Sequence, residues 1–270
     1  MRNFTIYFLT LFAWTMFLAT CSQAQRATAD WDPELTEVWE PVPEVVSPGK
    51  NGEPPSDAII LFDGENLDKW GMAPRGNRMN IVNTEKEDWT TGPVEWTVED
   101  GVMTVVPGTG DIMTRQGFGD IQLHIEWKTP EEIDGDGQGR GNSGVFLQSL
   151  YEIQVLDSYE NPTYPNGQAG SVYKQKKPLV NASLPPGEWQ TFDIFFEAPV
   201  FRDDGRLVKP AYVTVLHNGI LIQHRTRIEG PTVFRGLPEY TKHPEKLPIR
   251  LQDHRDYVSF RNIWVRELKL

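Results

Sequence analysis

The segment DIQLHIEWKT, residues 120–129, alternates apolar and polar side chains with the two-residue period of a β-strand. Ile121, Leu123 and Ile125 fall on one face, and Gln122 and His124 fall on the other. A strand with this pattern packs one face against a core and leaves the other face polar. The segment therefore predicts a half-buried antiparallel sheet.

Similar strands separated by turns recur along the rest of the chain. VEWTVEDGVMTVV, residues 94–106, contains two β-type runs around Asp100-Gly101, and HNG, residues 217–219, joins two more. No stretch keeps a helical period for more than two turns, and no internal repeat is evident. We predict an all-β fold for residues 58–270, a jelly-roll β-sandwich of two antiparallel sheets.

The composition is that of an ordinary globular protein of 270 residues with a formal net charge of -12. Its basic residues form no long cluster, which argues against a nucleic-acid partner because phosphate binding needs a basic patch. A single cysteine excludes a disulfide within the chain, so burial of apolar side chains must supply its stability.

The first 24 residues have the pattern of an export signal, with a basic start and a long apolar core. The apolar core could in principle span a bilayer, but small residues after it favour processing. LATC resembles a lipobox that would place a lipid anchor on Cys21, and cleavage after Ala24 is the equally weighted alternative. Both place the protein outside the cytoplasm, in the periplasm or anchored to the envelope.

Residues 25–57 follow as a segment rich in proline, glutamate and valine. Proline removes backbone donors and disfavours helix, so we expect an extended linker or a strap that lies on the domain.

One strand-like run contains polar groups where a core strand would be apolar. In YEIQVLD, residues 151–157, Glu152 and Gln154 share a face. Asp157 would point away in a regular strand, unless a bulge or the strand end returns it to that face. The spacing E-x-Q-x-x-D matches the E-x-D-x-x-E of jelly-roll glycosidases, but the amide in the middle speaks against a retaining pair of carboxylates.

These polar residues could simply lie on a solvated sheet face, and the pattern alone gives that interpretation about equal weight. Their neighbours favour a sugar site. GNSG, residues 141–144, permits close approach of the backbone, and Tyr159, Tyr164 and Tyr173 follow the strand. Aromatic rings beside carboxylates suit the apolar faces and hydroxyls of sugars.

No spacing of histidines or acids indicates a metal site strongly. His254 ends a strand beside Asp253, and isolated histidines are more often structural than catalytic. DGDGQGRGN, residues 134–142, resembles the start of a calcium loop but has Val145 where the twelfth-position glutamate belongs. No cofactor is certain from the sequence, and calcium or a similar divalent metal stays open.

Four segments together resemble the 3-keto-disaccharide hydrolase domain family, over roughly residues 58–270. They are GNSGVFLQSLYEIQVLDSY, PPGEWQTFDIFFEAPVF, VTVLHNG and LPIRLQDHRDYVSFRNIWVREL. The resemblance implies a concanavalin A-like fold with the substrate on the concave sheet. It also implies cleavage of glycosides already oxidised at C3, by hydrolysis or by β-elimination.

Residue type and motif position then suggest roles in acting on a carbohydrate substrate. We expect Glu152 to be the first acid–base group, with Asp157 second and His254 as a proton shuttle or metal ligand. The expected sugar-binding residues are Asn142, Gln148, Gln154, Tyr159 and Tyr173. Two other functions fit the same pattern, namely a carbohydrate-binding module without catalysis and a glycoside hydrolase acting on unoxidised sugars. The sequence does not give the oligomeric state.

Overall fold

A computed structural model describes residues 32–50 and 52–270 of the chain. The chain divides into two units, Met1–Val46 and Ser47–Leu270. The described part of the first unit has one short 3-10 helix, η1 (Pro33–Thr36), and no other regular element. The predicted export signal and Cys21 lie outside the described residues.

The second unit consists of two antiparallel sheets and a separate hairpin, β10 (Val200–Phe201) with β11 (Leu207–Lys209). The larger sheet has the order β13-β12-β9-β6-β15-β4-β3, with β1 paired to β15. Its strands are β1 (Ile59–Phe62), β3 (Thr97–Glu99), β4 (Val102–Thr104), β6 (Ile121–Lys128), β9 (Gln190–Glu197), β12 (Tyr212–His217), β13 (Ile220–Arg227) and β15 (Ser259–Glu267).

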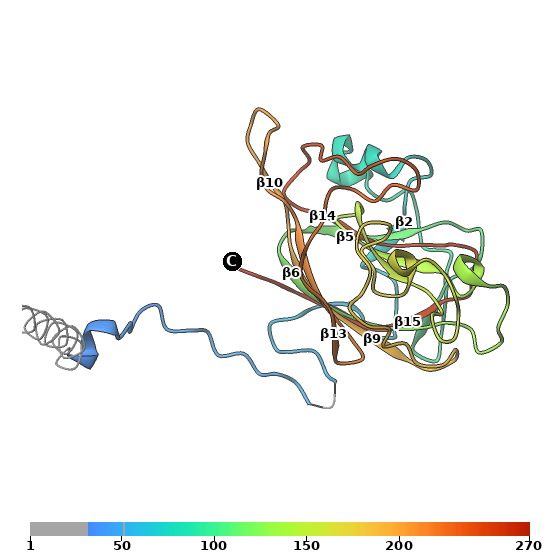
Figure 1. Cartoon of the computed structure of the whole chain (residues 1–270), viewed down its shortest axis with the longest axis horizontal. Coiled ribbons are helices and arrows are strands. Elements are labelled where there is room, and N and C mark those ends of the chain that lie inside the picture. The colour runs from blue at the N-terminus through green and yellow to red at the C-terminus, as the bar shows by residue number, and fades with distance from the viewer. Residues whose placement is uncertain (1–31, 51) are drawn as a thin grey trace, which may run out of the picture. The chain divides into compact units, whose positions relative to one another are not determined.

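The smaller sheet has the order β2-β5-β14-β7-β8. Its strands are β2 (Trp70–Met72), β5 (Ile112–Phe118), β7 (Ser143–Leu147), β8 (Tyr151–Val155) and β14 (Leu247–Leu251). The labelled strands of the two sheets lie in separate layers (Figure 1). Apolar side chains from both sheets form one buried cluster between them. The predicted class, a jelly-roll β-sandwich of two antiparallel sheets, is confirmed.

The helices of the described residues are all short 3-10 turns: η1, η2 (Arg78–Asn83), η3 (Lys86–Asp88), η4 (Gly137–Gly139) and η5 (Pro165–Gly167). Within residues 32–50 and 52–270, no helix is long and apolar enough to cross a membrane. The absence of longer helical patterns in the sequence agrees with this result.

The two predicted hairpins form at the expected turns. Asp100 and Gly101 have φ values of 50° and 78° between β3 and β4, and Asn218 and Gly219 have 52° and 77° between β12 and β13. Positive φ at both central residues defines the type I′ geometry that matches strand twist. The alternation of β6 is also observed, because Ile121, Leu123 and Ile125 are buried in the core.

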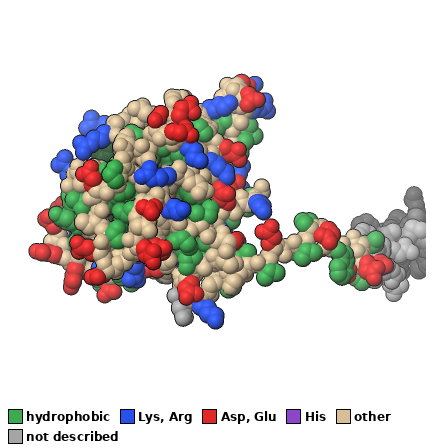
Figure 2. All heavy atoms as spheres, turned by 180° about the vertical axis from the view of Figure 1, so that it is seen from behind, with side chains coloured by type: hydrophobic (Ala, Val, Ile, Leu, Met, Phe, Trp, Pro, Cys, Tyr) green, Lys and Arg blue, Asp and Glu red, His purple; other side chains and the backbone are tan. Residues whose placement is uncertain are grey.

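Basic and acidic side chains are interspersed on the face of the second unit that Figure 2 shows. No continuous basic band crosses that face.

Candidate active site

The outer face of the smaller sheet bears the polar strand residues. In β8, Tyr151, Ile153 and Val155 belong to the core cluster, so Glu152 and Gln154 point to the opposite face. The strand is nevertheless buried along its whole length. Both faces of β8 are therefore covered, one by the core and one by the walls of a cavity.

Two loop segments close the free edge of β8 and enclose Glu152. The Thr232 hydroxyl accepts a hydrogen bond from the Glu152 backbone N–H at 3.0 Å. On the same edge, the Tyr173 N–H donates to the Glu152 carbonyl at 3.2 Å, and the Gln154 N–H donates to Ser171 O at 3.0 Å. These bonds satisfy an edge that would otherwise expose backbone groups, and they fix Tyr173 and Thr232 beside Glu152.

Glycine in the neighbouring strand makes room for the Glu152 carboxyl group. In β7, Phe146 pairs with Glu152 and Gly144 pairs with Gln154. A Cβ atom at Gly144 would lie 2.7 Å from Glu152 Oε1 and 2.9 Å from Phe146 Cε2. The carboxyl group therefore occupies the space that any larger residue at position 144 would fill, and this explains the glycine of GNSG.

Burial dominates the electrostatics of Glu152, which is only 4 % exposed. Loss of hydration raises its pKa to about 8, with the nearby cation of Arg78 opposing the rise and Asp111 adding to it. Among the described residues, none donates a hydrogen bond to its carboxyl oxygens. An acid held without donors and with a pKa near neutrality is suited to proton transfer.

A cavity of about 690 Å³ opens above this face of the sheet. It brings together five residues that the sequence predicted: Asn142, Glu152, Gln154, Tyr173 and His254. Asn142 precedes β7, which pairs with β8 on one side and with β14 on the other. Tyr173 lies on the segment bonded to the free edge of β8, and His254 follows β14.

Gln154 and Asn142 form a hydrogen-bonded pair at the base of this set. Gln154 Nε2 donates to Asn142 Oδ1 at 2.9 Å and to the Val155 carbonyl at 3.0 Å. Asn142 is held in turn, since its backbone N–H donates to Asp256 Oδ2 and its Nδ2 donates to Gln138 O, both at 2.7 Å. The pair presents amide groups in fixed positions, as recognition of sugar hydroxyls requires.

Tyr173 contributes a phenol group to the cavity from the segment that lies along the free edge of β8. Its hydroxyl lies 2.7 Å from that of Tyr164. Burial is the main cause that raises its pKa above the usual value, and the bond to Tyr164 and the charge of Glu152 raise it further. Tyr173 therefore stays protonated at neutral pH and can donate a hydrogen bond or a proton.

Three residues predicted for the site lie elsewhere. Asp157 forms an ion pair with Arg140 at 2.6 Å and lines a different cavity. Gln148 uses its Nε2 to hold the carbonyls of Phe118 and Glu245. Tyr159 lies beyond the end of β8, with its backbone N–H bonded to Asp157.

The position of Asp157 follows from where β8 ends. The last strand residue is Val155, and the chain then turns toward the acidic loop that contains Arg140. No bulge returns Asp157 to the face of Glu152. We therefore assign Asp157 a role in packing that loop.

Several lining residues were missed by sequence reasoning. Arg78, Thr232 and Gln252 line the same cavity. Gln252 had a signal, because Arg250 and Gln252 alternate with apolar residues in LPIRLQD as Glu152 and Gln154 do in YEIQVLD. Arg78 had none, since it begins a short 3-10 turn whose position depends on distant contacts.

No cluster of three or more histidine, cysteine, aspartate or glutamate side chains suited to a metal ion occurs within residues 32–50 and 52–270.

Comparison with known proteins shows the family of this chain. A model of the 3-keto-alpha-glucoside-1,2-lyase-like domain matches residues 57–266. The chain belongs to this family. Membership confirms the resemblance seen in the sequence and places the chain among carbohydrate-cleaving enzymes.

Relatives of this chain support the same assignment. A 3-keto-disaccharide hydrolase of Bacteroides thetaiotaomicron is 26 % identical over an alignment of 248 residues, and the match covers 78 % of each chain. A crystal structure from Parabacteroides distasonis, provisionally assigned as a glycosyl hydrolase, is 48 % identical. That match covers 88 % of this chain and 97 % of the other, with a TM-score of 0.78. A second structure from that organism shares the fold, with 21 % identity, a TM-score of 0.54 and coverage of 79 % and 94 %.

Replacement of the glycine beneath the carboxyl group tests the geometry of the site. Gly144→Ala is expected to push the Glu152 carboxyl aside, because the new methyl group would lie 2.7 Å from Oε1. Displacement of a reacting group by about 1 Å can cost as much as 10²-fold, so we expect kcat/KM to fall roughly 10–100-fold. Steady-state kinetics on a 3-keto-disaccharide measure this.

Gly92→Ala is the matched control, because a Cβ there would meet no atom within 4 Å. Both variants should keep the β-sandwich spectrum in circular dichroism. Unchanged kinetics for Gly144→Ala would show that the carboxyl position is not critical.

Proposed function

We propose that the protein is an exported enzyme that cleaves 3-keto-glycosides by β-elimination, with addition of water completing a net hydrolysis. The main support is Glu152, a buried carboxyl group in a sugar-sized cavity with a pKa raised to about 8. The family model and the Bacteroides relative point to the same oxidised substrates. Export rests on the sequence pattern of residues 1–24.

The chemistry follows from the ketone at C3. That ketone acidifies the C2 hydrogen, and Glu152 removes it as a proton, leaving the electron pair in an enolate shared by C2 and C3. When the C3 carbonyl re-forms, the pair creates a C1–C2 double bond and the C1–O bond breaks. The departing oxygen keeps the bonding electrons and accepts a proton. Water can then add its hydroxyl to C1 and its hydrogen to C2.

The cavity residues suit the steps of this route. A base with a pKa near the working pH transfers protons efficiently, and Glu152 meets this condition. The positive charge of Arg78, which acts to lower the pKa of Glu152, would stabilise the enolate oxygen. Among the described lining residues, Tyr173, Lys174 and His254 could protonate the departing oxygen, while Gln154 and Asn142 would hold hydroxyl groups.

The composition of the cavity favours this route over a retaining glycosidase. Among the described residues that line it, Glu152 is the one carboxylic acid. A retaining mechanism needs a second carboxylate at about 5–5.5 Å as the nucleophile. Elimination needs a single base together with a proton donor, and both are present.

Turnover of matched substrates tests the proposal. Purified protein is given a disaccharide and the same disaccharide oxidised at C3, and released sugar is followed by chromatography. We expect cleavage of the oxidised form alone, with a transient absorbance from the conjugated enone that elimination produces. Cleavage of the unoxidised form would instead indicate an ordinary glycosidase, and binding without cleavage of either would indicate a carbohydrate-binding module.

A further inference from the structure

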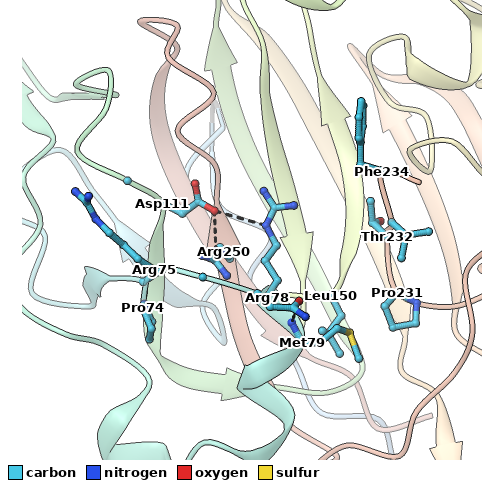
Figure 3. Close-up of a pocket in the computed structure, with 15 residues that line it drawn as sticks. Pro74, Arg75, Arg78, Met79, Asp111, Leu150, Pro231, Thr232, Phe234 and Arg250 are labelled. Carbon is cyan, nitrogen blue, oxygen red and sulfur yellow. Dashed lines mark hydrogen bonds and ion pairs between the residues drawn. The ribbon is translucent and has the colours of Figure 1, made fainter. Parts of the chain in front are cut away.

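A second cavity of about 660 Å³ lies next to the catalytic one. The two share Arg78, Thr232 and Phe234 as lining residues. A substrate that places its reacting ring over Glu152 can therefore extend past Arg78 into this neighbouring space. Figure 3 shows Arg78 between Asp111 on one side and Thr232 and Phe234 on the other.

The neighbouring cavity has an excess of positive charge. Arg75, Arg78 and Arg250 line it, and Asp111 is the one acid among its described lining residues. Asp111 Oδ2 lies 2.8 Å from Arg250 Nε and 3.7 Å from Arg78 Nε (Figure 3). Its other oxygen accepts the Asp253 N–H at 2.9 Å. This excess stands out in a chain with a net charge of -12.

The Asp111 carboxylate is thus shared by two guanidinium groups, and Arg250 is the one whose charge is more deeply buried. Arg250 is only 6 % exposed. Burial lowers its pKa, as expected for a cation removed from water, while Asp111 opposes that effect. Within the described part of the chain, no hydrogen bond engages its two terminal nitrogens. A buried cation is stable when it is paired and hydrogen-bonded, so these N–H groups are suited to an additional anion.

The Arg78 guanidinium also lacks a close carboxylate partner. Its guanidinium lies 4.1 Å above the Phe146 ring, and the distance to Asp111 is longer than that of a hydrogen bond. Glu152 would neutralise Arg78 only when ionised, which its raised pKa disfavours at neutral pH. Arg78 and Arg250 therefore have N–H groups that can bind a further anion beside the reacting ring.

We propose that this arginine cavity binds a carboxylate of the substrate, so that the enzyme acts on 3-keto-glycosides in which the oxidised ring is attached to a uronic acid. The planar fork of a guanidinium matches a carboxylate through two parallel hydrogen bonds. Phe234, two-thirds exposed at the rim, offers an aromatic face for the acidic sugar. The inference rests on the proposed function for the position of the reacting ring.

Binding to the intact protein tests the inference without turnover. Calorimetry with methyl glucuronoside and methyl glucoside should show at least about 10-fold tighter binding of the acid, weakened by added salt. Glucose 6-sulfate has the same charge without a planar carboxylate and should bind less tightly than the glucuronoside. Equal affinity for all three sugars would overturn the inference, and equal affinity for the two anions would overturn the assignment to uronic acids.

Substitution of the cavity arginines tests whether they cause the preference for the glucuronoside. Arg75→Gln changes an exposed side chain, so the fold should persist while the preference for the glucuronoside falls several-fold. Arg250→Lys keeps the charge but removes the fork and should reduce the preference further. Arg206→Gln, on the β10–β11 hairpin, is the matched control and should leave the preference unchanged. A preference that survives both cavity variants would contradict the inference.

Kinetics separate this inference from the proposed function. A 3-keto-glucosyl-glucuronic acid should be cleaved with a higher kcat/KM than the corresponding 3-keto-glucosyl-glucose. Turnover of both at equal kcat/KM would overturn the inference and leave the proposed function intact. Selective glucuronoside binding without turnover of either would support the anion site and overturn the proposed function.

Discussion

Glu152→Gln is expected to lower kcat/KM on a 3-keto-disaccharide by about 10²–10⁴-fold, the usual effect of losing one proton-transfer group. The amide is nearly isosteric with the carboxylic acid, so the side chain should still fit above Gly144 without a clash. It cannot accept the C2 proton, however, and no other carboxylate among the described residues lines the cavity. Steady-state kinetics at pH 8 measure the loss. Glu99→Gln on β3 is a matched control, because it makes the same chemical change on an exposed strand residue.

The pH profile of the unmodified protein identifies the role of the same carboxyl group. A base must be ionised, so kcat/KM should rise with pH and level off above about 8, where the pKa of Glu152 lies. A profile that falls above pH 8 would make Glu152 the acid in place of the base. Near-normal activity of Glu152→Gln would exclude both roles and leave His254 or Tyr173 as the proton-transfer group.

The strands and hairpins could be predicted because their causes are local. Alternation in β6 follows from one buried face, and Asp100-Gly101 and Asn218-Gly219 readily adopt the positive φ values that a type I′ turn needs. The same two-residue period places Glu152 and Gln154 together on the outer face of β8. These features depend on a few neighbouring residues and on general stereochemistry.

The rest of the site depends on tertiary contacts that no local pattern encodes. Asp157 follows β8 by two residues, yet its ion pair with Arg140 turns it away from the cavity. Arg78 reaches the cavity from a 3-10 turn about 70 residues before Glu152, held by an Asn77 cap and packed on Phe146. A residue-type argument could suggest a sugar site, but it could not distinguish Asp157 from Arg78 as the partner of Glu152.

The substitution that removes activity is also expected to stabilise the protein at alkaline pH. In the unfolded chain Glu152 has its usual pKa of 4.5, and in the folded chain its pKa is about 8. Between these values the folded state retains a proton that the unfolded state has lost, so the free energy of unfolding falls as pH rises. One pKa unit corresponds to about 1.4 kcal/mol, so the full penalty above pH 8 is about 5 kcal/mol. Glutamine does not ionise, so the Glu152→Gln variant does not pay this free-energy penalty.

Urea unfolding of both proteins at pH 5, 7 and 9 measures this effect. At pH 5 the two should have similar stability, since a protonated carboxyl and an amide both remain uncharged at position 152. At pH 9 Glu152→Gln should be more stable by about 5 kcal/mol. The other titrating groups are common to both proteins and cancel in the difference. A constant difference across the three pH values would mean that the Glu152 carboxyl ionises as easily in the folded chain as in the unfolded one. The gain in stability on removing this acid would then be absent, and with it the reason to regard the site as strained in favour of proton transfer.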